Sequence, residues 1–137
     1  DQAKSRADLF SGCGALSFPL LSGGPVHAFE GDAGMVAAAR RAVRQDSTRS
    51  LTASVRDLAR DPLNPAELNR FDAVVFDPPR AGAAAQSREL AMSGVPTVIA
   101  VSCNPATLAR YRIELVTPID QFAWSAHIEA VAVLRRP

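Results

Sequence analysis

Cysteine, histidine and long apolar runs are all scarce in this chain of 137 residues. Cys13 and Cys103 lie far apart, and His27 and His127 stand at spacings that match no zinc pattern. We therefore expect neither a disulfide framework nor a structural metal. The longest apolar stretches fall short of the ~18 residues that cross a bilayer, and no apolar signal core follows the polar first residues. We expect no membrane span and no secretion, and hence a cytoplasmic protein.

An excess of charge of one sign is also missing. Lys and Arg number 15 against 14 Asp and Glu, and no run of five or six like charges marks a basic arm. Charge alone therefore does not indicate nucleic acid. The hydrophobic share is 47% and the mean hydropathy is +0.03, which argues against a disordered chain. This length suffices for one core and not for two ordinary domains, so residues 1–137 are expected to form a single domain.

Short apolar runs alternate with Ala-rich helical stretches along the chain, a pattern typical of βαβ units around a parallel sheet. The predicted strands are Ala7 to Phe10, Val26 to Glu30, Leu51 to Val55, Ala73 to Asp77, Thr97 to Val101, Ile113 to Thr117 and Ile128 to Leu134. The predicted helices are Leu16 to Leu21, Ala33 to Val43, Pro65 to Asn69, Gln86 to Ser93 and one that starts near Pro105, since proline suits a first helical position.

A Gly-X-Gly turn, in the segment DLFSGCG from Asp8 to Gly14, ends the first predicted strand. Such glycines let a backbone approach a ligand closely. The third glycine of a dinucleotide fingerprint would fall at Ser17, so a plain strand-to-helix turn is an equally good interpretation. Acidic residues favour a ligand: Glu30 ends the second strand, where a carboxylate can accept from both ribose hydroxyls, and Asp57 follows the third, near an adenine edge. With no phosphate-binding lysine, these positions suit a nucleoside-bearing ligand such as S-adenosylmethionine.

Two prolines follow Asp77 at the end of the fourth predicted strand. They fix the backbone and remove donors, so this loop is expected to form a stiff ledge. It lies at the carboxyl end of the sheet, where open α/β folds bind ligands. An aspartate that merely closes a strand is the structural alternative. The position of Asp77 relative to the glycine loop favours a functional role.

Cys103 lies in the segment SCNPATLAR, just past the fifth strand and next to a predicted helix start. A helix N-terminus stabilises a thiolate, which makes Cys103 a candidate nucleophile, although such a cysteine is more often a small buried hydrophobe. We interpret Cys13 as such a small buried hydrophobe, because the glycine loop leaves it no evident base. In the last strand, alternation places His127 and Glu129 on one face. An acid/base pair and a plain solvent-facing edge are both open there.

Five segments of the chain, taken in order, resemble one known family. They are DLFSGCG, FEGD, FDPPRAG, SCNPATLAR and HIEAVAVLRR, which together extend over about residues 7 to 136. They look like the catalytic domain of the S-adenosylmethionine-dependent RNA 5-methyluridine methyltransferases. The resemblance implies a doubly wound class I methyltransferase fold with the last strand antiparallel, S-adenosylmethionine as cofactor, and tRNA or rRNA as substrate. It implies Cys103 as nucleophile, Glu129 as base and Asp77 as the residue that holds uracil. The implied cofactor site consists of Asp8, Gly12, Gly14, Glu30, Asp57 and Asp77.

The chemistry gives independent reasons for these roles. Carbon 5 of uracil is too weak a nucleophile to take a methyl group from a sulfonium, but a thiolate added at carbon 6 makes it an enolate. Cys103 would supply that thiolate. The proton on carbon 5 must then leave before the cysteine is eliminated, and Glu129 is the fitting base. Asp77 could accept from N3–H of uracil, which cytosine lacks.

The chain also departs from the family it resembles. These 137 residues include neither the N-terminal RNA-binding domain nor the inserted region of usual members, and two cysteines cannot ligate the iron–sulfur cluster that some members carry. Tyr111 follows SCNPATLAR where the family pattern has Asp. Only the 11 residues from Ser102 to Arg112 connect two parallel strands, a crossover that takes a dozen or more. We therefore expect that this is part of a longer chain, with residues missing between Arg110 and Tyr111 and a similar break near Lys4.

Two other functions stay open. An amino methyltransferase acting on adenine or glutamine nitrogen uses a proline-proline-aromatic ledge, but Arg80 occupies the place of the aromatic residue. Cys103 and Glu129 would also have no role in that reaction. A non-catalytic cofactor-binding or RNA-binding fragment is the other alternative. Methylation of a uridine-containing RNA by the chain separates these functions.

Overall fold

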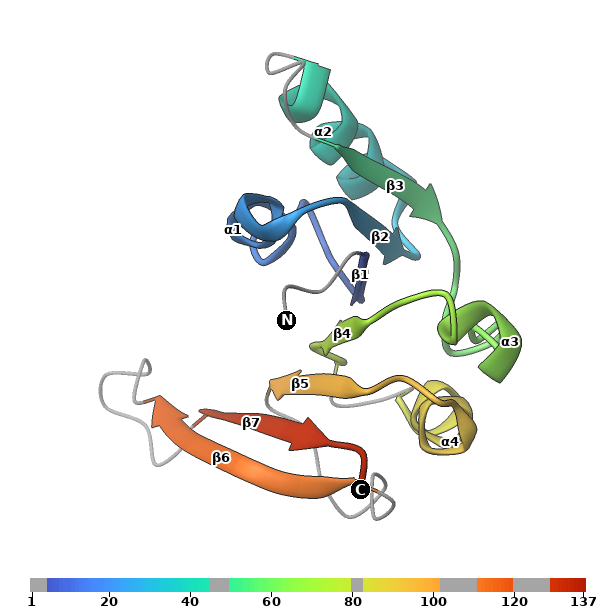
Figure 1. The fold of residues 1–137 in the computed structure, drawn as a ribbon. Helices are drawn as coiled ribbons and strands as arrows, with labels where there is room; N and C mark the ends of the chain where they lie inside the picture. Colours follow the sequence, from blue (N-terminus) through green and yellow to red (C-terminus); the bar gives the residue numbers. More distant parts are fainter. Residues whose placement is uncertain (1–4, 45–49, 80–82, 102–110, 120–128) are drawn as a thin grey trace.

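A single seven-stranded sheet forms the centre of the molecule, with strand order β3-β2-β1-β4-β5-β7-β6 (Figure 1). The computed structural model describes residues 5–44, 50–79, 83–101, 111–119 and 129–137. The strands are β1 (Arg6–Leu9), β2 (Val26–Glu30), β3 (Leu51–Val55), β4 (Ala73–Phe76), β5 (Thr97–Val101), β6 (Arg112–Ile119) and β7 (Glu129–Arg135). The helices are α1 (Ser17–Leu20), α2 (Ala33–Arg44), α3 (Pro65–Leu68) and α4 (Ala84–Met92), with a 3₁₀ turn η1 (Leu21–Gly23).

The first five strands are parallel, and β7 lies antiparallel between β5 and β6. This arrangement confirms the doubly wound fold with an antiparallel last strand. The chain runs outward from β1 through β2 to β3, then returns to the other side of β1 with β4. The order of strands therefore reverses beside β1, and open α/β sheets bind ligands at the carboxyl ends of the strands at such a point.

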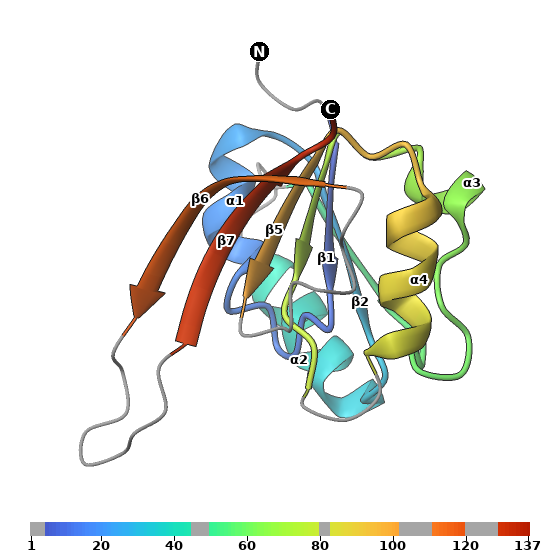
Figure 2. The ribbon, with the colours of Figure 1, turned by 90° about the horizontal axis from the view of Figure 1, so that it is seen from below.

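Helices cover both faces of the sheet (Figures 1 and 2). On one face α2 packs on β2 and β3 through Val36 and Ala39. On the other face, Leu68 of α3 and Leu90 of α4 pack against Phe76 and its neighbours in the larger core cluster. All three of these side chains are fully buried, and each such burial contributes about 1.5–3 kcal/mol. The alternating apolar positions of the parallel strands are thus used on both sides.

A capping box starts α3, and an ion pair between Glu67 and Arg56 joins this helix to the end of β3. The Asn64 side chain accepts from the Glu67 backbone N–H at 3.0 Å, and Glu67 Oε2 accepts from the Asn64 N–H at 2.9 Å. Pro65 occupies the first turn, where its missing N–H is harmless. Arg56 Nη1 lies 2.6 Å from Glu67 Oε1, and its hydrogen bond lowers the pKa of that carboxyl. The chain after β3 is therefore held close to the sheet.

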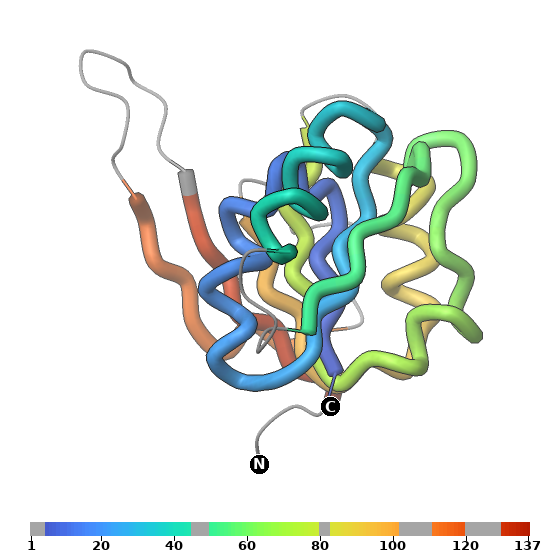
Figure 3. The backbone as a smooth tube through the Cα atoms, turned by 90° about the horizontal axis from the view of Figure 1, so that it is seen from above, coloured from blue at the N-terminus to red at the C-terminus, as the bar shows by residue number. Residues whose placement is uncertain are grey.

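The strand β6 forms one edge of the sheet, and Figure 3 shows it (orange) outermost beside β7 (red). It runs in the same direction as β5, because each of them is antiparallel to β7. Every residue of β6 is exposed. Ile113, Leu115 and Val116 are 50–56% exposed, so this edge leaves apolar surface uncovered on both faces.

Within the described residues, the predicted ends of the helices and strands agree with the structure to within two residues. The second, third and fifth strands have the predicted bounds, whereas Phe10 and Asp77 lie one residue beyond their strands. The helix expected from Leu16 to Leu21 is shorter and continues as the 3₁₀ turn η1. The helix expected near Pro105 lies outside the described residues. None of the helices in the described ranges is long and apolar enough to cross a membrane.

Candidate active site

The glycine loop after β1 requires backbone conformations that favour glycine. Gly12 and Gly14 have φ values of 57° and 101°, in the left-handed region. A Cβ on Gly14 would lie 2.9 Å from the Phe18 ring, so only glycine fits there. Phe10 also has a positive φ of 62°, which is unfavourable for a side chain of this size. Its ring packs edge-on against Phe76 with centroids 5.8 Å apart, a contact that helps to hold this conformation.

The backbone at Gly12 is open to a ligand. A Cβ built there would meet only the Met35 sulfur, at 3.9 Å, so conformation rather than space calls for glycine. The Gly12 N–H donates to Glu30 Oε2 at 2.9 Å, and the Asp32 N–H donates to Oε1 at 2.9 Å. Glu30 therefore ties the loop after β1 to the end of β2. Each carboxylate oxygen has a second lone pair that can accept from a ligand hydroxyl.

Asp8 lies in the central strand and is fully buried. Ser17 Oγ donates to Asp8 Oδ2 at 2.5 Å, while Oδ1 has no hydrogen-bond partner among the described residues. Burial raises the pKa of Asp8 from 3.8 to about 6, the Ser17 hydrogen bond opposes this, and the negative charges of Asp77 and Glu30 add to it. Three carboxyl groups thus surround the glycine loop.

Asp77 and Asp57 lie at the same edge of the sheet. The Asp77 N–H donates to the Leu9 carbonyl at 3.3 Å, which extends the pairing of β4 and β1 to the start of the loop. Asp57 follows β3, has a side chain 55% exposed, and accepts from the Ala59 N–H at 3.1 Å. The Arg56 N–H donates to the Glu30 carbonyl at 2.8 Å and joins the end of β3 to that of β2. The structure therefore brings the predicted cofactor residues together near the carboxyl ends of the parallel strands β1 to β4.

These residues fit a nucleoside-bearing cofactor. The open backbone at Gly12 allows close approach, Glu30 offers acceptor positions for ribose, and Asp8 presents a buried oxygen that lacks a partner. Asp57 is exposed at the end of β3. To reach a base edge, its side chain would have to move away from Arg60, whose Nε lies 3.7 Å from Asp57 Oδ2. Within the described ranges, no three or more His, Cys, Asp or Glu residues form a group that could hold a metal.

Of the two predicted catalytic residues, the structure describes only Glu129, at the start of β7. Cys103 and the neighbouring His127 lie outside the described residues. Glu129 is the first residue of β7 and pairs with Ile119 of β6. Val101, the last residue of β5, pairs with Val131 of β7. Glu129 therefore precedes, by two residues along β7, the residue that lies opposite the end of β5.

Two features of the site were missed by sequence reasoning. Ser17 counts against a dinucleotide fingerprint because it replaces the third glycine, yet its hydroxyl holds Asp8 from the first turn of α1. Phe10 was assigned to the first strand, whereas it begins the turn. The polar residue at the expected glycine position was the available signal for Ser17. Nothing in the residue type of Phe10 indicates a positive φ.

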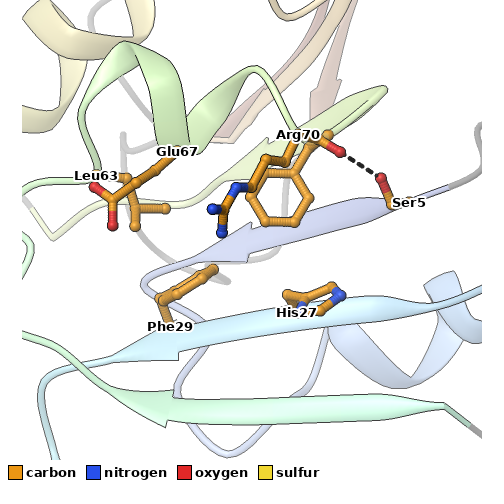
Figure 4. A pocket seen from close by; sticks show the side chains of 7 residues that line it. Ser5, His27, Phe29, Leu63, Glu67 and Arg70 are labelled. Atoms are coloured by element: carbon orange, nitrogen blue, oxygen red, sulfur yellow. Dashed lines mark hydrogen bonds between the residues drawn. The ribbon is translucent and has the colours of Figure 1, made fainter.

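A separate pocket of about 260 Å³ lies beside β2, on the face that carries α3. Figure 4 shows His27 and Phe29 side by side on β2, with Arg70 above them. The His27 and Phe29 rings lie 5.5 Å and 6.3 Å from the Phe71 ring, between centroids. Ser5 Oγ donates to the Arg70 carbonyl at 2.8 Å at one end of this pocket. None of the predicted cofactor or catalytic residues that the structure describes lines this pocket.

The order of the strands, the antiparallel β7 and the glycine loop define a class I methyltransferase fold. A solved structure with a TM-score of 0.80 and 29% sequence identity is the Pyrococcus abyssi tRNA (uracil-54, C5)-methyltransferase in complex with S-adenosyl-L-homocysteine. The match covers 96% of this chain and 34% of that one. The magnesium protoporphyrin IX methyltransferase of Synechocystis with bound SAM has a TM-score of 0.74 at 18% identity, and covers 96% of this chain and 69% of that one.

Sequence comparison narrows this class to one family. A family model described as tRNA (Uracil-5-)-methyltransferase matches residues 41–137, and the chain belongs to that family. It is 51% identical to an RNA methyltransferase of Mesorhizobium japonicum over 146 residues, covering 99% of this chain and 35% of the relative. It is 39% identical to the 23S rRNA (uracil(1939)-C(5))-methyltransferase RlmD of Pseudomonas fluorescens, covering 96% of this chain and 32% of that protein.

The chain spans about a third of the length of these curated relatives. The match to the Mesorhizobium japonicum protein extends over 146 residues, more than the 137 of this chain. That relative therefore has residues within the match that this chain lacks. Because the connection from β5 to β6 is short, we expect these residues to be missing between Arg110, which lies outside the described residues, and Tyr111.

Proposed function

We propose that this chain is the catalytic domain of an S-adenosylmethionine-dependent enzyme that forms 5-methyluridine in tRNA or rRNA, with Cys103 as nucleophile. The pairing of Val101 with Val131 carries this proposal. In the sequence, Cys103 follows Val101 by two residues and Glu129 precedes Val131 by two, which supports a shared site where β5 ends.

The remaining substrate residue belongs to the neighbouring strand. Phe76, the last residue of β4, pairs with Ala100 of β5, so Asp77 stands next to the end of β5. The order along this edge is then Asp77 after β4, Cys103 after β5 and Glu129 at the start of β7. A uracil ring bound here would have an acceptor for N3–H, a thiolate for carbon 6 and a base for carbon 5.

The glycine loop and the ends of β2 and β3 would hold S-adenosylmethionine, which supplies an electrophilic methyl group when it is bound. Gly12 and Gly14 permit close approach of the loop backbone, and Glu30 accepts from the ribose hydroxyls. Asp57 accepts from the amino group at the adenine edge. Because β1 and β4 are adjacent, this site adjoins Asp77 and the uracil position.

The residues of the chain carry out three steps. The Cys103 thiolate adds to carbon 6 of uracil, and the electron pair of the carbon 5–carbon 6 double bond moves into the enolate. Carbon 5 then takes the methyl group, while the electron pair of the broken carbon–sulfur bond stays on the donor sulfur. Finally Glu129 removes the proton from carbon 5, the double bond re-forms, and the bond between carbon 6 and Cys103 breaks to release the thiolate.

The proposal is tested by incubating the chain with S-adenosylmethionine and unmodified transcripts of tRNA and 23S rRNA, followed by mass spectrometry of the nucleosides. We expect 5-methyluridine, and the transcript that accumulates it identifies the RNA class. Cys103→Ala should abolish the product, while Cys13→Ala, which changes the exposed cysteine of the glycine loop, should retain it. Methylated adenosine would indicate an amino methyltransferase instead. Cofactor binding without any methylated nucleoside would indicate a non-catalytic domain.

A further inference from the structure

Asp8 is a buried ionisable group to which the proposed reaction assigns no proton transfer. It lies at the centre of the sheet, in register with Ala28 of β2 and Val75 of β4, and none of its surface reaches solvent. Oδ2 accepts from Ser17 Oγ at 2.5 Å, but Oδ1 has no partner in the part of the chain that the structure describes. A buried carboxylate oxygen without a donor or a cation is unfavourable, so this position is suited to a neutral carboxyl or to a carboxylate with a cation nearby.

Among the residues that the structure describes, two carboxyls act on the charge of Asp8. Glu30 contributes from β2 and Asp77 from the end of β4, whereas α1 and the paired residues Ala28 and Val75 contribute no charge. Both carboxylates oppose ionisation of Asp8. Together with burial, they raise the pKa of Asp8 to about 6. A positive charge bound beside these carboxyls would favour the ionised form of Asp8.

We infer that Asp8 holds a proton in the free domain at mildly acidic pH and releases it to solvent when a cationic methyl donor occupies the adjoining glycine loop. This inference rests on the proposed function, since it takes the sulfonium of S-adenosylmethionine as the cation. The product S-adenosylhomocysteine has lost the positive charge at sulfur, so Asp8 takes the proton back after methyl transfer. Asp8 is then a residue that favours the charged donor over the neutral product.

Linkage gives this inference a measurable consequence. A nearby positive charge favours the ionised carboxyl, and reciprocally the ionised carboxyl binds the cation more tightly. If donor binding lowers the pKa of Asp8 by about two units or more, the affinity for S-adenosylmethionine falls about tenfold between pH 7 and pH 5. The affinity for S-adenosylhomocysteine should change much less over that range. The preference for donor over product should therefore decrease as the pH falls.

Calorimetric titration of the chain in buffers of different ionisation enthalpy tests this directly. At pH 6, binding of S-adenosylmethionine should release about half a proton, with close to none at pH 8 and a smaller release for S-adenosylhomocysteine. Asp8→Asn keeps an oxygen that accepts from Ser17 but cannot ionise, and should lose both the proton release and the tenfold pH effect. Asp61→Asn removes a carboxyl whose side chain is 73% exposed, and should keep both.

Different outcomes separate this inference from the proposed function. Heats of S-adenosylmethionine binding that are independent of buffer at pH 6 would overturn the role of Asp8, even if Asp8→Asn does not fold. Unchanged proton release in a folded Asp8→Asn variant would overturn it as well. Failure of the unaltered chain to bind S-adenosylmethionine at any pH would instead contradict the proposed function, and the inference with it.

Discussion

Gly12 donates its backbone N–H to Oε2 of Glu30 at 2.9 Å, so a carboxylate of the second strand holds the loop that follows the first. The other oxygen of Glu30 holds the start of α2 through the Asp32 N–H. One side chain thus fixes the relative positions of two segments that we propose face the cofactor. It also offers the acceptor positions that a ribose needs, which makes its substitution informative.

Replacement of Glu30 by alanine should weaken S-adenosylmethionine binding by about 1–3 kcal/mol, the range for the loss of hydrogen bonds to a charged acceptor. Glu30→Gln should weaken it less, because the amide oxygen still accepts one hydrogen bond. Calorimetric titration of the three proteins at pH 7.5 measures the difference. Equal affinities for the unaltered chain and Glu30→Ala would show that the ribose binds elsewhere.

Asp8→Asn should stabilise the fold in a pH-dependent way. The pKa of Asp8 is raised from 3.8 to about 6, so the folded domain binds this proton more tightly than the unfolded chain. The favourable contribution of the protonated carboxyl is complete below about pH 4 and is lost as the pH rises to about 6, a change of about 3 kcal/mol. Urea unfolding should therefore show Asp8→Asn more stable than the unaltered chain by up to that amount at pH 7.5. At pH 4 the two should be similar, and an equal difference at both pH values would contradict this account.

Gly14→Ala should destabilise the domain by more than 1 kcal/mol, since it combines a φ of 101° with a Cβ only 2.9 Å from the Phe18 ring. Gly31→Ala is the matched control. Its Cβ would be no closer than 3.7 Å to the Asp57 backbone, and its φ is not in the left-handed region. Thermal unfolding compares the two variants. A Gly14→Ala protein as stable as Gly31→Ala would mean that the loop does not need the observed conformation.

Periodicity and turn chemistry were sufficient to predict the sheet. The strands Val26–Glu30 and Thr97–Val101 could be bounded correctly because a proline directly precedes each of them. Glu30 could be predicted as a site residue because it ends a parallel strand. Phe10 could not be placed correctly, since an aromatic residue favours a strand and only its contact with Phe76 supports the observed turn.

The least predictable features depend on contacts between distant residues. The hydrogen bond from Ser17 to Asp8 depends on how α1 docks over β1, which no local pattern encodes. The raised pKa of Asp8 likewise arises from burial and from carboxylates on two other strands. The assignments of Cys103 and Glu129 come from the family resemblance and from reaction chemistry, and they stay predictions.

Glu129→Gln should separate the base from the nucleophile. The variant should still form the adduct and methylate carbon 5, then stall because the proton on carbon 5 cannot be removed. RNA should remain attached to the protein on a denaturing gel. Glu114→Gln is the control, since Glu114 is an exposed carboxylate of β6 that pairs with Arg135 at 2.8 Å. Normal product formation by Glu129→Gln with no trapped complex would make Glu129 a strand-edge residue only.

The central claim is that Cys103 attacks carbon 6 of uracil. An RNA with 5-fluorouridine at the target position tests it most directly, because fluorine at carbon 5 cannot leave as a proton does and the covalent complex is expected to persist. With S-adenosylmethionine present, the unaltered chain and Cys13→Ala should each give a gel-shifted complex, and peptide mass spectrometry should locate the nucleotide on Cys103. Cys103→Ala should bind S-adenosylmethionine with nearly unchanged affinity and give no complex and no 5-methyluridine. Appreciable formation of 5-methyluridine by Cys103→Ala would contradict the account.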